Sequence, residues 1–542
     1  MKTEGLAAPM CGLMMHRELS IPAILDYAAE VTPGLRITSA RVEGDLHSYT
    51  IREARVRIRR LASALQAQGF GPGDRIATLA WNGYRHFELY YAIAGIGAVC
   101  HTINPRLFPE QISWIMNHAK DQALFFDTTF NDLVASLHPQ MPAGIKLYSL
   151  SDTPVMPGAT AFETLIAGAE ELSAWTEVPE ATAVAMCYTS GTTGDPKAAL
   201  YSHRSTILHA MSTALAAPDS FGQGRRVMPV VPLFHVNAWG LPYTAPLTGT
   251  DIVFPGPKLD GASVFSLMEE TGVTASWGVP TVWAGLLEEM RKAGRKPAGL
   301  EVLYIGGSAL APAMIGSFDA FNVRALHAWG MTEMSPIGTI TRPTPSQDPA
   351  ERIAEATPQG KRTFGVEIRI VDEEGQILPH DDQATGELLV RGHGVISAYY
   401  DAPAASAKAF DAEGWFRTGD VARISPEGQL TIVDRTKDLI KSGGEWISSI
   451  DLENAAIACA GVAMAAAVAV PHPRWDERPL LAVIRAPGSE VTPEAILEVM
   501  AARMPKWQLP DDVVFVESIP LTATGKISKK DLRVQLKDYY QS

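Results

Sequence analysis

Apolar residues recur along the chain at two spacings, one typical of helices and one typical of strands. Thr50 and Glu53 form a capping-box pattern in front of a periodic apolar run, which predicts a helix ending near Gly69. An earlier run predicts another helix, and the inward residues of the two are Ile21, Ile24, Leu25 and Ala28, then Ile51, Ile58, Leu61 and Leu65. Short β-rich runs between turn residues predict strands over 75–79, 124–126, 146–149, 181–187, 198–201, 274–280, 302–305, 325–329, 386–392 and 430–433.

The order of these elements predicts an α/β fold with domains of unequal size. Strands and helices alternate as in layered α/β domains, and 542 residues correspond to about three to four domain-sized units. The charged stretch 434–438, followed by an apolar pair and then Gly443 and Gly444, has the composition of a domain boundary. After it come a helix from Ser449, strands over 463–470 and 480–485, and a helix capped by Thr492 and Pro493. We therefore expect a large multi-subdomain N-terminal α/β domain, 1–434, and a small C-terminal α+β domain, 441–542.

The charge balance argues against two classes of partner. The chain has 46 Lys and Arg residues against 60 Asp and Glu residues, which gives a net charge of −14. Nucleic acids and anionic membranes attract basic surfaces, so we expect neither as a partner. The longest apolar runs, 94–100 and 455–470, are too short or too rich in small residues to cross a bilayer, so no stable membrane insertion is expected.

The cysteines and the first residues indicate a reducing compartment. Cys11, Cys100, Cys187 and Cys459 are few and far apart, and they show no metal-ligand spacing. The stretch 1–15 contains acidic Glu4 and is interrupted by proline and glycine, so it lacks the apolar core of a signal peptide. A cytoplasmic location is the expectation that fits both features.

The stretch from Tyr188 to Lys197 has the composition of an anion-binding loop. Its glycines let successive backbone N–H groups converge, its hydroxyls add rotatable donors, and Lys197 adds charge, a combination suited to a polyphosphate. The alternative is a polar surface turn, although predicted strands flank the stretch on both sides. The spacing differs from the Walker loop of ordinary nucleotide hydrolases. The residues concerned are Thr189, Ser190, Gly191, Thr192, Thr193, Gly194 and Lys197.

Polar residues also follow two predicted strands, where ligands of α/β sheets collect, and a further carboxylate follows a glycine downstream. Gly307 and its neighbours follow the strand at 302–305 and leave room for a flat base, or else form a plain turn. Thr332 and Glu333 offer a hydroxyl for phosphate and a carboxylate for Mg²⁺, or else form a helix N-cap. Asp420 follows a glycine and can accept from two ribose hydroxyls, or else it belongs to a turn.

Taken together, these segments resemble the adenylate-forming superfamily of acyl-CoA synthetases, luciferases and peptide-synthetase adenylation domains. The resemblance extends over nearly the whole chain. It includes the stretch 235–240, the pair Arg435 and Lys437, and the Thr/Gly-rich stretch around Lys526. It implies ATP, Mg²⁺ and CoA as cofactors or cosubstrates, a small-molecule carboxylic acid as substrate, and a homodimer. It also implies that the C-terminal domain is a mobile lid that turns about a hinge at 435–440, with Lys437 at the pivot.

The resemblance assigns site residues position by position. It implies Lys526, Glu333 and His235 as catalytic residues, and Thr189 and Glu333 as the metal site. Nucleotide or CoA contacts beyond the phosphate loop are implied for Gly307, Ser308, Ala309, His327, Ala328, Trp329, Gly330, Met331, Thr332, Asp420, Arg435, Lys437, Lys441, Ser442, Gly443, Gly444, Glu445 and Trp446. The acyl pocket is implied to contain His235, Val236, Trp239, Trp277, Gly307, Gly330 and Pro336.

The implied reaction is a two-step ligation through an acyl-adenylate. Within the superfamily, the stretches 101–107 and 505–513 most resemble bacterial methylmercaptopropionyl-CoA ligases and medium-chain fatty acyl-CoA ligases. The pocket segment begins with His235, where amino-acid-activating members commonly have an aspartate, which argues against an amino-acid substrate. Three alternatives stay open: transfer of the acyl group to a carrier protein, luciferase-like oxidation, and a nucleotide-binding homologue without catalysis.

Overall fold

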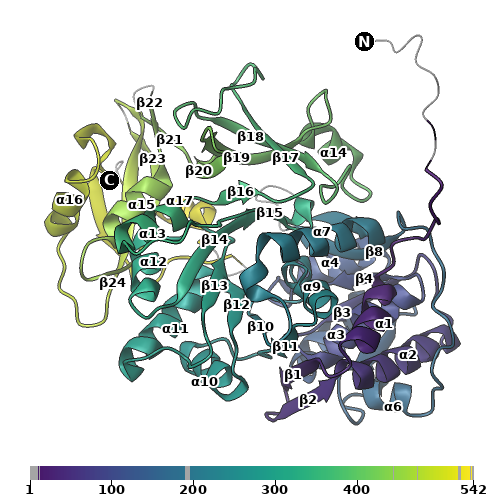
Figure 1. Ribbon diagram of the computed structural model, residues 1–542. Coiled ribbons are helices and arrows are strands. Elements are labelled where there is room, and N and C mark those ends of the chain that lie inside the picture. Colours follow the sequence, from purple (N-terminus) through teal and green to yellow (C-terminus); the bar gives the residue numbers. More distant parts are fainter. Residues whose placement is uncertain are drawn as a thin grey trace.

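A computed structural model describes residues 10, 12–189, 196–442, 445–472, 474–522, 527–537 and 539 of the chain. Three β-sheets organise it, and Figure 1 shows the helices packed around them. The helices are α1 Ile21–Val31, α2 Ile51–Ala67, α3 Tyr84–Gly95, α4 Pro109–Ala119, α5 Asn131–Leu137, α6 Phe162–Ala167, α7 His203–Ala216, α8 Val236–Trp239, α9 Leu241–Thr248, α10 Gly261–Thr271, α11 Pro280–Ala293, α12 Pro312–Asp319, α13 Pro349–Ala356, α14 Pro403–Ala409, α15 Ser449–Ile457, α16 Pro493–Ala501 and α17 Lys529–Leu536.

The largest sheet has a parallel centre and an antiparallel arm. Strands β10, β12, β13 and β14 pair in parallel, and β14 pairs with β15 in the antiparallel direction. The full order is β17 (Val366–Val371), β18 (Gly386–Gly392), β19 (Phe416–Ile424), β20 (Gln429–Arg435), β16 (Gly360–Arg362), β15 (Ile337–Ile340), β14 (Arg324–Gly330), β13 (Val302–Ile305), β12 (Ala275–Gly278), β10 (Arg226–Pro229), β11 (Asp251–Phe254), β1 (Arg36–Ala40) and β2 (Leu46–Thr50).

A second sheet of the large domain supplies the strands on either side of the predicted phosphate loop. Its strands pair in parallel from β7 to β8, and only the last pair, β8 with β9, is antiparallel. The order is β7 (Ala159–Ala161), β6 (Lys146–Ser149), β5 (Ala123–Phe126), β3 (Arg75–Leu79), β4 (Val99–Thr102), β8 (Ala183–Thr189) and β9 (Lys197–Ser202).

The third sheet belongs to the small C-terminal domain, which is drawn in light green to yellow in Figure 1. It contains β22 (Glu445–Ile447), β21 (Ile440–Ser442), β24 (Asp476–Arg485) and β23 (Val462–His472), with β25 (Asp512–Phe515) paired to β24. The predicted α/β class, with a large N-terminal and a small C-terminal domain, is confirmed. The last strand of the large sheet ends at Arg435 and β21 begins at Ile440, while the hinge at 435–440 and the limits of the domains stay predictions.

Most of the helices and strands that the sequence predicts begin and end close to the predicted residues. The capping box is present, because the Glu53 N–H donates to Thr50 Oγ1 at 3.3 Å and the Thr50 N–H donates to Glu53 Oε2 at 2.7 Å. All eight apolar residues assigned to the inward faces of the first two helices are buried. No helix among the described residues is long and apolar enough to cross a membrane.

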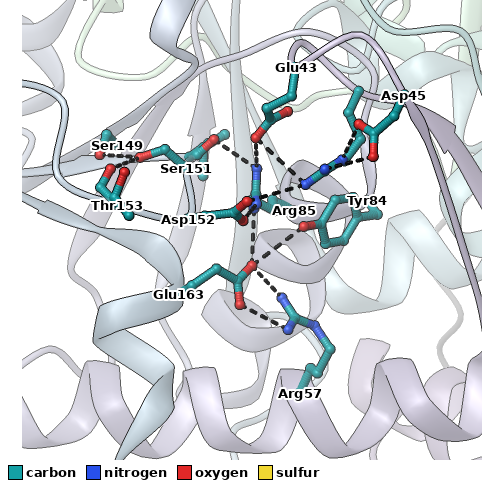
Figure 2. A network of polar contacts seen from close by, with 12 residues as sticks. Glu43, Asp45, Arg57, Tyr84, Arg85, Ser149, Ser151, Asp152, Thr153 and Glu163 are labelled. Atoms are coloured by element: carbon teal, nitrogen blue, oxygen red, sulfur yellow. Dashed lines mark hydrogen bonds and ion pairs between the residues drawn. The ribbon is translucent and has the colours of Figure 1, made fainter.

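A network of ion pairs stabilises the N-terminal part of the large domain, where α2 and α3 meet the loop after β6 (Figure 2). Glu163 accepts from Arg57 through both carboxylate oxygens, at 2.9 and 3.0 Å, and from Arg85 Nε at 3.1 Å. Arg85 also donates to Glu43 at 2.8 Å and pairs with Asp152. Partial burial acts to raise the pKa of Glu163, but its bonds to the two arginines hold the net pKa below the ordinary glutamate value.

We expect Glu163→Gln to lower the stability of this region by about 2–3 kcal/mol, because two mostly buried guanidinium groups lose their shared counter-charge. A carboxylate whose pKa is lowered by folding stabilises the protein at pH values above its ordinary pKa. This contribution is lost as the pH falls through the pKa that the group has in the folded state. The difference in thermal midpoint between wild type and variant should therefore be largest at neutral pH and shrink on acidification. Glu288→Gln, which breaks an exposed pair with Lys292, is the control that should change nothing measurable.

Candidate active site

The ends of β8 and β9 bring two predicted phosphate ligands face to face. Thr189 and Lys197 are register partners in the antiparallel pair, so the loop between them leaves and re-enters the sheet at one point. The Lys197 ammonium lies 5.2 Å from the centre of the Tyr399 ring. The remaining predicted loop residues lie outside the described part of the chain: Ser190, Gly191, Thr192, Thr193 and Gly194.

A buried carboxylate stands next to these strands. Glu333 lies in a 3-10 turn, Thr332–Met334, directly after β14, and the Tyr399 hydroxyl donates to its Oε1 at 2.7 Å. Burial raises the pKa of Glu333, whereas Tyr399 and the charges of Arg435 and Lys197 act in the opposite direction. The cap position of the turn is occupied by Met331, with no side-chain capping bond, so the N-cap explanation for Thr332 is wrong.

The residues around Glu333 suit a magnesium ion held mainly by phosphate oxygens. Among the described residues there is no group of three or more His, Cys, Asp or Glu side chains that could hold a metal alone. Mg²⁺ commonly takes one or two protein carboxylates together with phosphate oxygens and water. One buried carboxylate beside a predicted phosphate loop matches that requirement.

The predicted ribose ligand lies inside a strand. Asp420 is 2% exposed in the middle of β19 and is the register partner of Arg435 on β20, so the turn explanation is wrong. Its Oδ2 accepts from Trp329 Nε1 at 2.8 Å, and its Oδ1 pairs with Arg435 Nε at 2.6 Å. A carboxylate offers about four lone-pair sites, so two remain for vicinal hydroxyls. The tryptophan and the arginine hold the carboxylate in a fixed orientation.

The loop after β13 and the strand β14 approach each other closely. A Cβ atom on Gly306 would lie 2.5 Å from the Ala328 carbonyl oxygen and 3.1 Å from the Trp239 ring, so only glycine fits there. His327 on β14 is buried, and burial lowers its pKa, which keeps the ring neutral. These contacts bring the segment predicted to bind the base close to the predicted acyl-pocket residue Trp239, although the two are far apart in the sequence. Gly307, Ser308, Ala309, Ala328, Gly330, Met331 and Pro336 belong to these loops and strand ends.

The pocket segment contains an unusual left-handed turn. Val236, Asn237, Ala238 and Trp239 have φ between 47° and 56°, and Gly240 follows at 80°. Left-handed backbone costs about 1–2 kcal/mol for each non-glycine residue, so surrounding contacts must hold the turn. One such contact precedes the turn, where the Leu233 N–H donates to the buried Asn82 side chain at 2.6 Å.

The two predicted pocket tryptophans lie at different depths. Trp239, 8% exposed, packs against Gly306 and meets Trp277 edge to face at 6.4 Å. Trp277 is fully buried behind it, stacks on Tyr304 at 4.3 Å and donates to Ser220 Oγ at 3.1 Å. Contact of either ring with an acyl chain stays a prediction, and Trp239 is the ring placed in front.

We expect Trp239→Ala to shift the acid preference toward longer chains. The change removes a large ring beside the strand ends, and each additional methylene that becomes buried contributes about 0.8 kcal/mol, roughly fourfold in kcat/KM. The measurement is the ratio of kcat/KM for octanoate to that for butyrate, with Trp239→Phe as the control that retains a ring. An unchanged ratio in the alanine variant would show that Trp239 does not line the acyl pocket.

A small recess lies between the predicted phosphate and acyl segments. His235 and Phe234 form one side, and Tyr188 and Pro196, which flank the phosphate loop, form another. Thr102, Asn104, Leu107 and Ile115 complete the lining. The stretch 101–107 that carried the closer resemblance therefore lies next to His235.

Sequence reasoning missed two residues that connect the site. Tyr399 contacts both Glu333 and Lys197, yet it lies in a stretch without a recognisable pattern. His209 on α7 accepts from the Ile337 N–H at 3.0 Å, and its ring lies against Gly240. Burial lowers the pKa of His209 to about 3, so the ring is a neutral spacer between the Glu333 loop and the pocket turn.

The described residues predicted for the small domain lie on the hairpin β21–β22 or at the predicted hinge. The Nζ atom of Lys441 lies 5.5 Å from the centre of the Trp446 ring, and both side chains are exposed, as is Glu445. Ser442 is buried and accepts from Arg478 at 3.1 Å. The Lys437 side chain is exposed, and partial desolvation together with the charges of Arg435 and Arg533 lowers its pKa. Gly443, Gly444 and Lys526 lie outside the described residues.

Comparison with known proteins assigns both parts of the chain to one type of enzyme. The family described as AMP-binding enzyme matches residues 25–400, and the family described as AMP-binding enzyme C-terminal domain matches 451–526. A 3-methylmercaptopropionyl-CoA ligase of Ruegeria lacuscaerulensis is 45% identical over 98% of this chain and 99% of its own length. A medium-chain-fatty-acid–CoA ligase of Ectopseudomonas oleovorans is 44% identical over 98% of each. ATP-bound MatB from Rhodopseudomonas palustris has the same fold, with a TM-score of 0.83 at 24% identity over 97% of this chain and 100% of its own.

Proposed function

The chain belongs to the AMP-binding enzyme family, and from this premise we propose how its residues carry out the reaction. It is an AMP-forming acid–thiol ligase that uses ATP and CoA. A carboxylate oxygen attacks the α-phosphorus of ATP, and the bond to pyrophosphate breaks to leave an acyl-adenylate. The CoA sulfur then attacks the acyl carbon, the bond to AMP breaks, and the thiol proton is lost to solvent.

In the first step the chain's contribution is charge and position, because phosphoryl transfer requires little covalent chemistry from the protein. Thr189 and Lys197 hold the departing phosphates together with the loop between them. Glu333 anchors Mg²⁺, which when bound neutralises charge that develops on the phosphate oxygens. Asp420 and Arg435 fix the ribose, and His235 separates the acyl and phosphate sides. The arrangement that supports this is the buried Glu333 within reach of the charges of Lys197 and Arg435.

For the acid itself we propose 3-methylmercaptopropionate, with short- and medium-chain fatty acids as the alternative. The two relatives at 45% and 44% identity carry one name from each class. The two tryptophans behind the strand ends and the absence of a predicted partner for an amino group favour a small apolar acid.

A panel of acids tests this assignment. 3-Methylmercaptopropionate and pentanoate differ only by a sulfur atom in place of a methylene, so they form a matched pair, and butyrate and octanoate bracket them in length. We expect AMP and thioester to form with free CoA, with the highest kcat/KM for the thioether acid. A higher value for octanoate would favour the medium-chain alternative. AMP release without thioester would favour a carrier protein or an oxidative second step.

Three further properties complete the proposal. Mg²⁺ is the metal at Glu333, and its omission should abolish pyrophosphate formation.

The buried free thiols of Cys100, Cys187 and Cys459 are compatible with a reducing, cytoplasmic location. The homodimer implied by the resemblance is tested by light scattering at micromolar concentration, where a monomer mass would contradict it.

A further inference from the structure

A buried chain of polar contacts joins the end of β20 to the small domain. The backbone N–H and the hydroxyl of Ser449, the first residue of α15, both donate to Asp434 Oδ2 at 2.6 Å. Lys529, the first residue of α17, donates to Ser449 Oγ at 2.5 Å and pairs with Glu453 Oε1 at 2.7 Å. Asp434 and Ser449 are buried, and the Lys529 side chain is 12% exposed.

The two bonds between Ser449 and Asp434 cross the point at which the chain passes from one domain to the other, whereas Lys529 and its two partners all belong to the small domain. The N–H and hydroxyl of Thr436 both donate to the Gly419 carbonyl of β19, at 3.0 and 3.2 Å, so the chain as far as Thr436 is bound to the large sheet. Strand β21 of the small sheet begins at Ile440. Asp434 therefore lies on the large-domain side, and Ser449 lies on the other. A rotation about 437–439 must separate them.

A second serine makes a contact of the same kind. The Ser448 hydroxyl donates to the Val433 carbonyl at 2.7 Å, one residue before Asp434. The pair of Lys529 with Glu453, by contrast, lies entirely within the small domain and would survive a rotation. The rotation would thus leave the Asp434 carboxylate without both Ser449 donors, while Lys529 would keep one counter-charge.

The hairpin β21–β22 indicates which of the two reaction steps this orientation serves. Lys441 and Glu445 are exposed and Trp446 is 47% exposed, so the side chains next to the tip of the hairpin face solvent, while Ser442 is buried. The family resemblance implies that this hairpin lies at the site during thioester formation and away from it during adenylate formation. The orientation with the hairpin outside is the first-step orientation.

We propose that Asp434 and Ser449 are positioning residues for the first half-reaction, which hold the small domain in its adenylate-forming orientation, and that Lys529 keeps the Ser449 hydroxyl in place for this contact. The proposal rests on the proposed function and on a pivot at or near Lys437. Because the contacts exist in one orientation only, they shift the equilibrium between the two orientations by their free energy. If a half-reaction requires the less populated orientation, its rate is reduced in proportion to the fraction of molecules that adopt that orientation.

The test measures the two half-reactions separately in Asp434→Asn and Ser449→Ala. The first assay follows pyrophosphate release from acid and Mg·ATP without CoA. The second follows thioester formation from chemically prepared acyl-adenylate and CoA. We expect the first rate to fall and the second to stay or rise, so that their ratio changes about tenfold. Asp319→Asn is the matched control, since its bidentate pair with Arg352 lies within the large domain and should leave the ratio unchanged.

Three results would overturn the proposal. An equal fall of both rates would show that the cluster only supports the fold. Unchanged rates in both assays would show that the cluster does not affect the equilibrium between the two orientations. A fall of the second rate alone would show that the contacts stabilise the other orientation. A failure of the proposed function gives a different result, since wild type itself would then form no adenylate from any acid in the panel.

Discussion

Replacing Lys526 by alanine is expected to slow adenylate formation by about 10²–10³-fold, equivalent to about 3–4 kcal/mol. The resemblance assigns this lysine to the α-phosphate and carboxylate oxygens, where charge develops as the reaction proceeds. An interaction of this kind is stronger in the transition state than before it, so its loss appears in kcat. Pyrophosphate release in a single turnover measures the step directly.

The same Lys526→Ala variant should convert prepared acyl-adenylate and CoA to thioester at nearly the wild-type rate, because that substrate is already activated. Lys530→Ala, four positions later and exposed, is the matched control that should leave both steps unchanged. Equal loss of both steps in the Lys526 variant would contradict its first-step role, as would a wild-type rate of adenylation.

Glu333→Gln is expected to cost about 10²-fold or more in adenylate formation. The substitution preserves the shape of the side chain and an acceptor for the Tyr399 hydroxyl, but it removes the negative charge that would hold Mg²⁺. A bound metal contributes several kcal/mol of charge stabilisation in such reactions. Pyrophosphate release as a function of Mg²⁺ concentration is the measurement, and the variant should need far more Mg²⁺ for half-maximal rate.

Tyr399→Phe separates the charge of Glu333 from its hydrogen bond. It leaves the carboxylate in place and removes one charge-assisted bond, so we expect a loss of about tenfold, well below that of Glu333→Gln. Wild-type Mg²⁺ dependence in Glu333→Gln would exclude Glu333 as the metal ligand.

Local patterns were sufficient to predict the strands at the centre of the first two sheets and several helices of this fold. Strands β3, β6, β13 and β18 begin and end at the predicted residues, because turn residues limit each apolar run on both sides. The helix from Ser449 and the cap at Thr492 were predicted for the same reason. Strands such as β9, β14 and β20 extend one or two residues further than predicted, since pairing with a neighbouring strand continues beyond the run of β-forming residues, whereas β12 is shorter than predicted.

Features that depend on contacts between distant segments could not be predicted in this way. The left-handed turn of 236–239 contains only one residue type that favours positive φ, Asn237, and its Val, Ala and Trp residues adopt positive φ only because their surroundings hold them. Tyr399 approaches Glu333 across 66 positions, and Lys529 approaches Ser449 across 80. Asp420 looked like a turn residue or a ribose ligand from its glycine neighbour, and the pairing of β19 with β20 places it inside a sheet.

The measurement that tests the central claim most directly follows oxygen from the acid. Acid labelled with ¹⁸O in both carboxylate positions is incubated with the wild-type enzyme, Mg·ATP and CoA, and the products are analysed by mass spectrometry. Attack of the carboxylate on the α-phosphorus predicts one ¹⁸O atom in AMP and one in the thioester carbonyl. Label in inorganic phosphate together with ADP, or unlabelled AMP, would contradict an acyl-adenylate and with it the roles given to Glu333, Lys197 and Lys526.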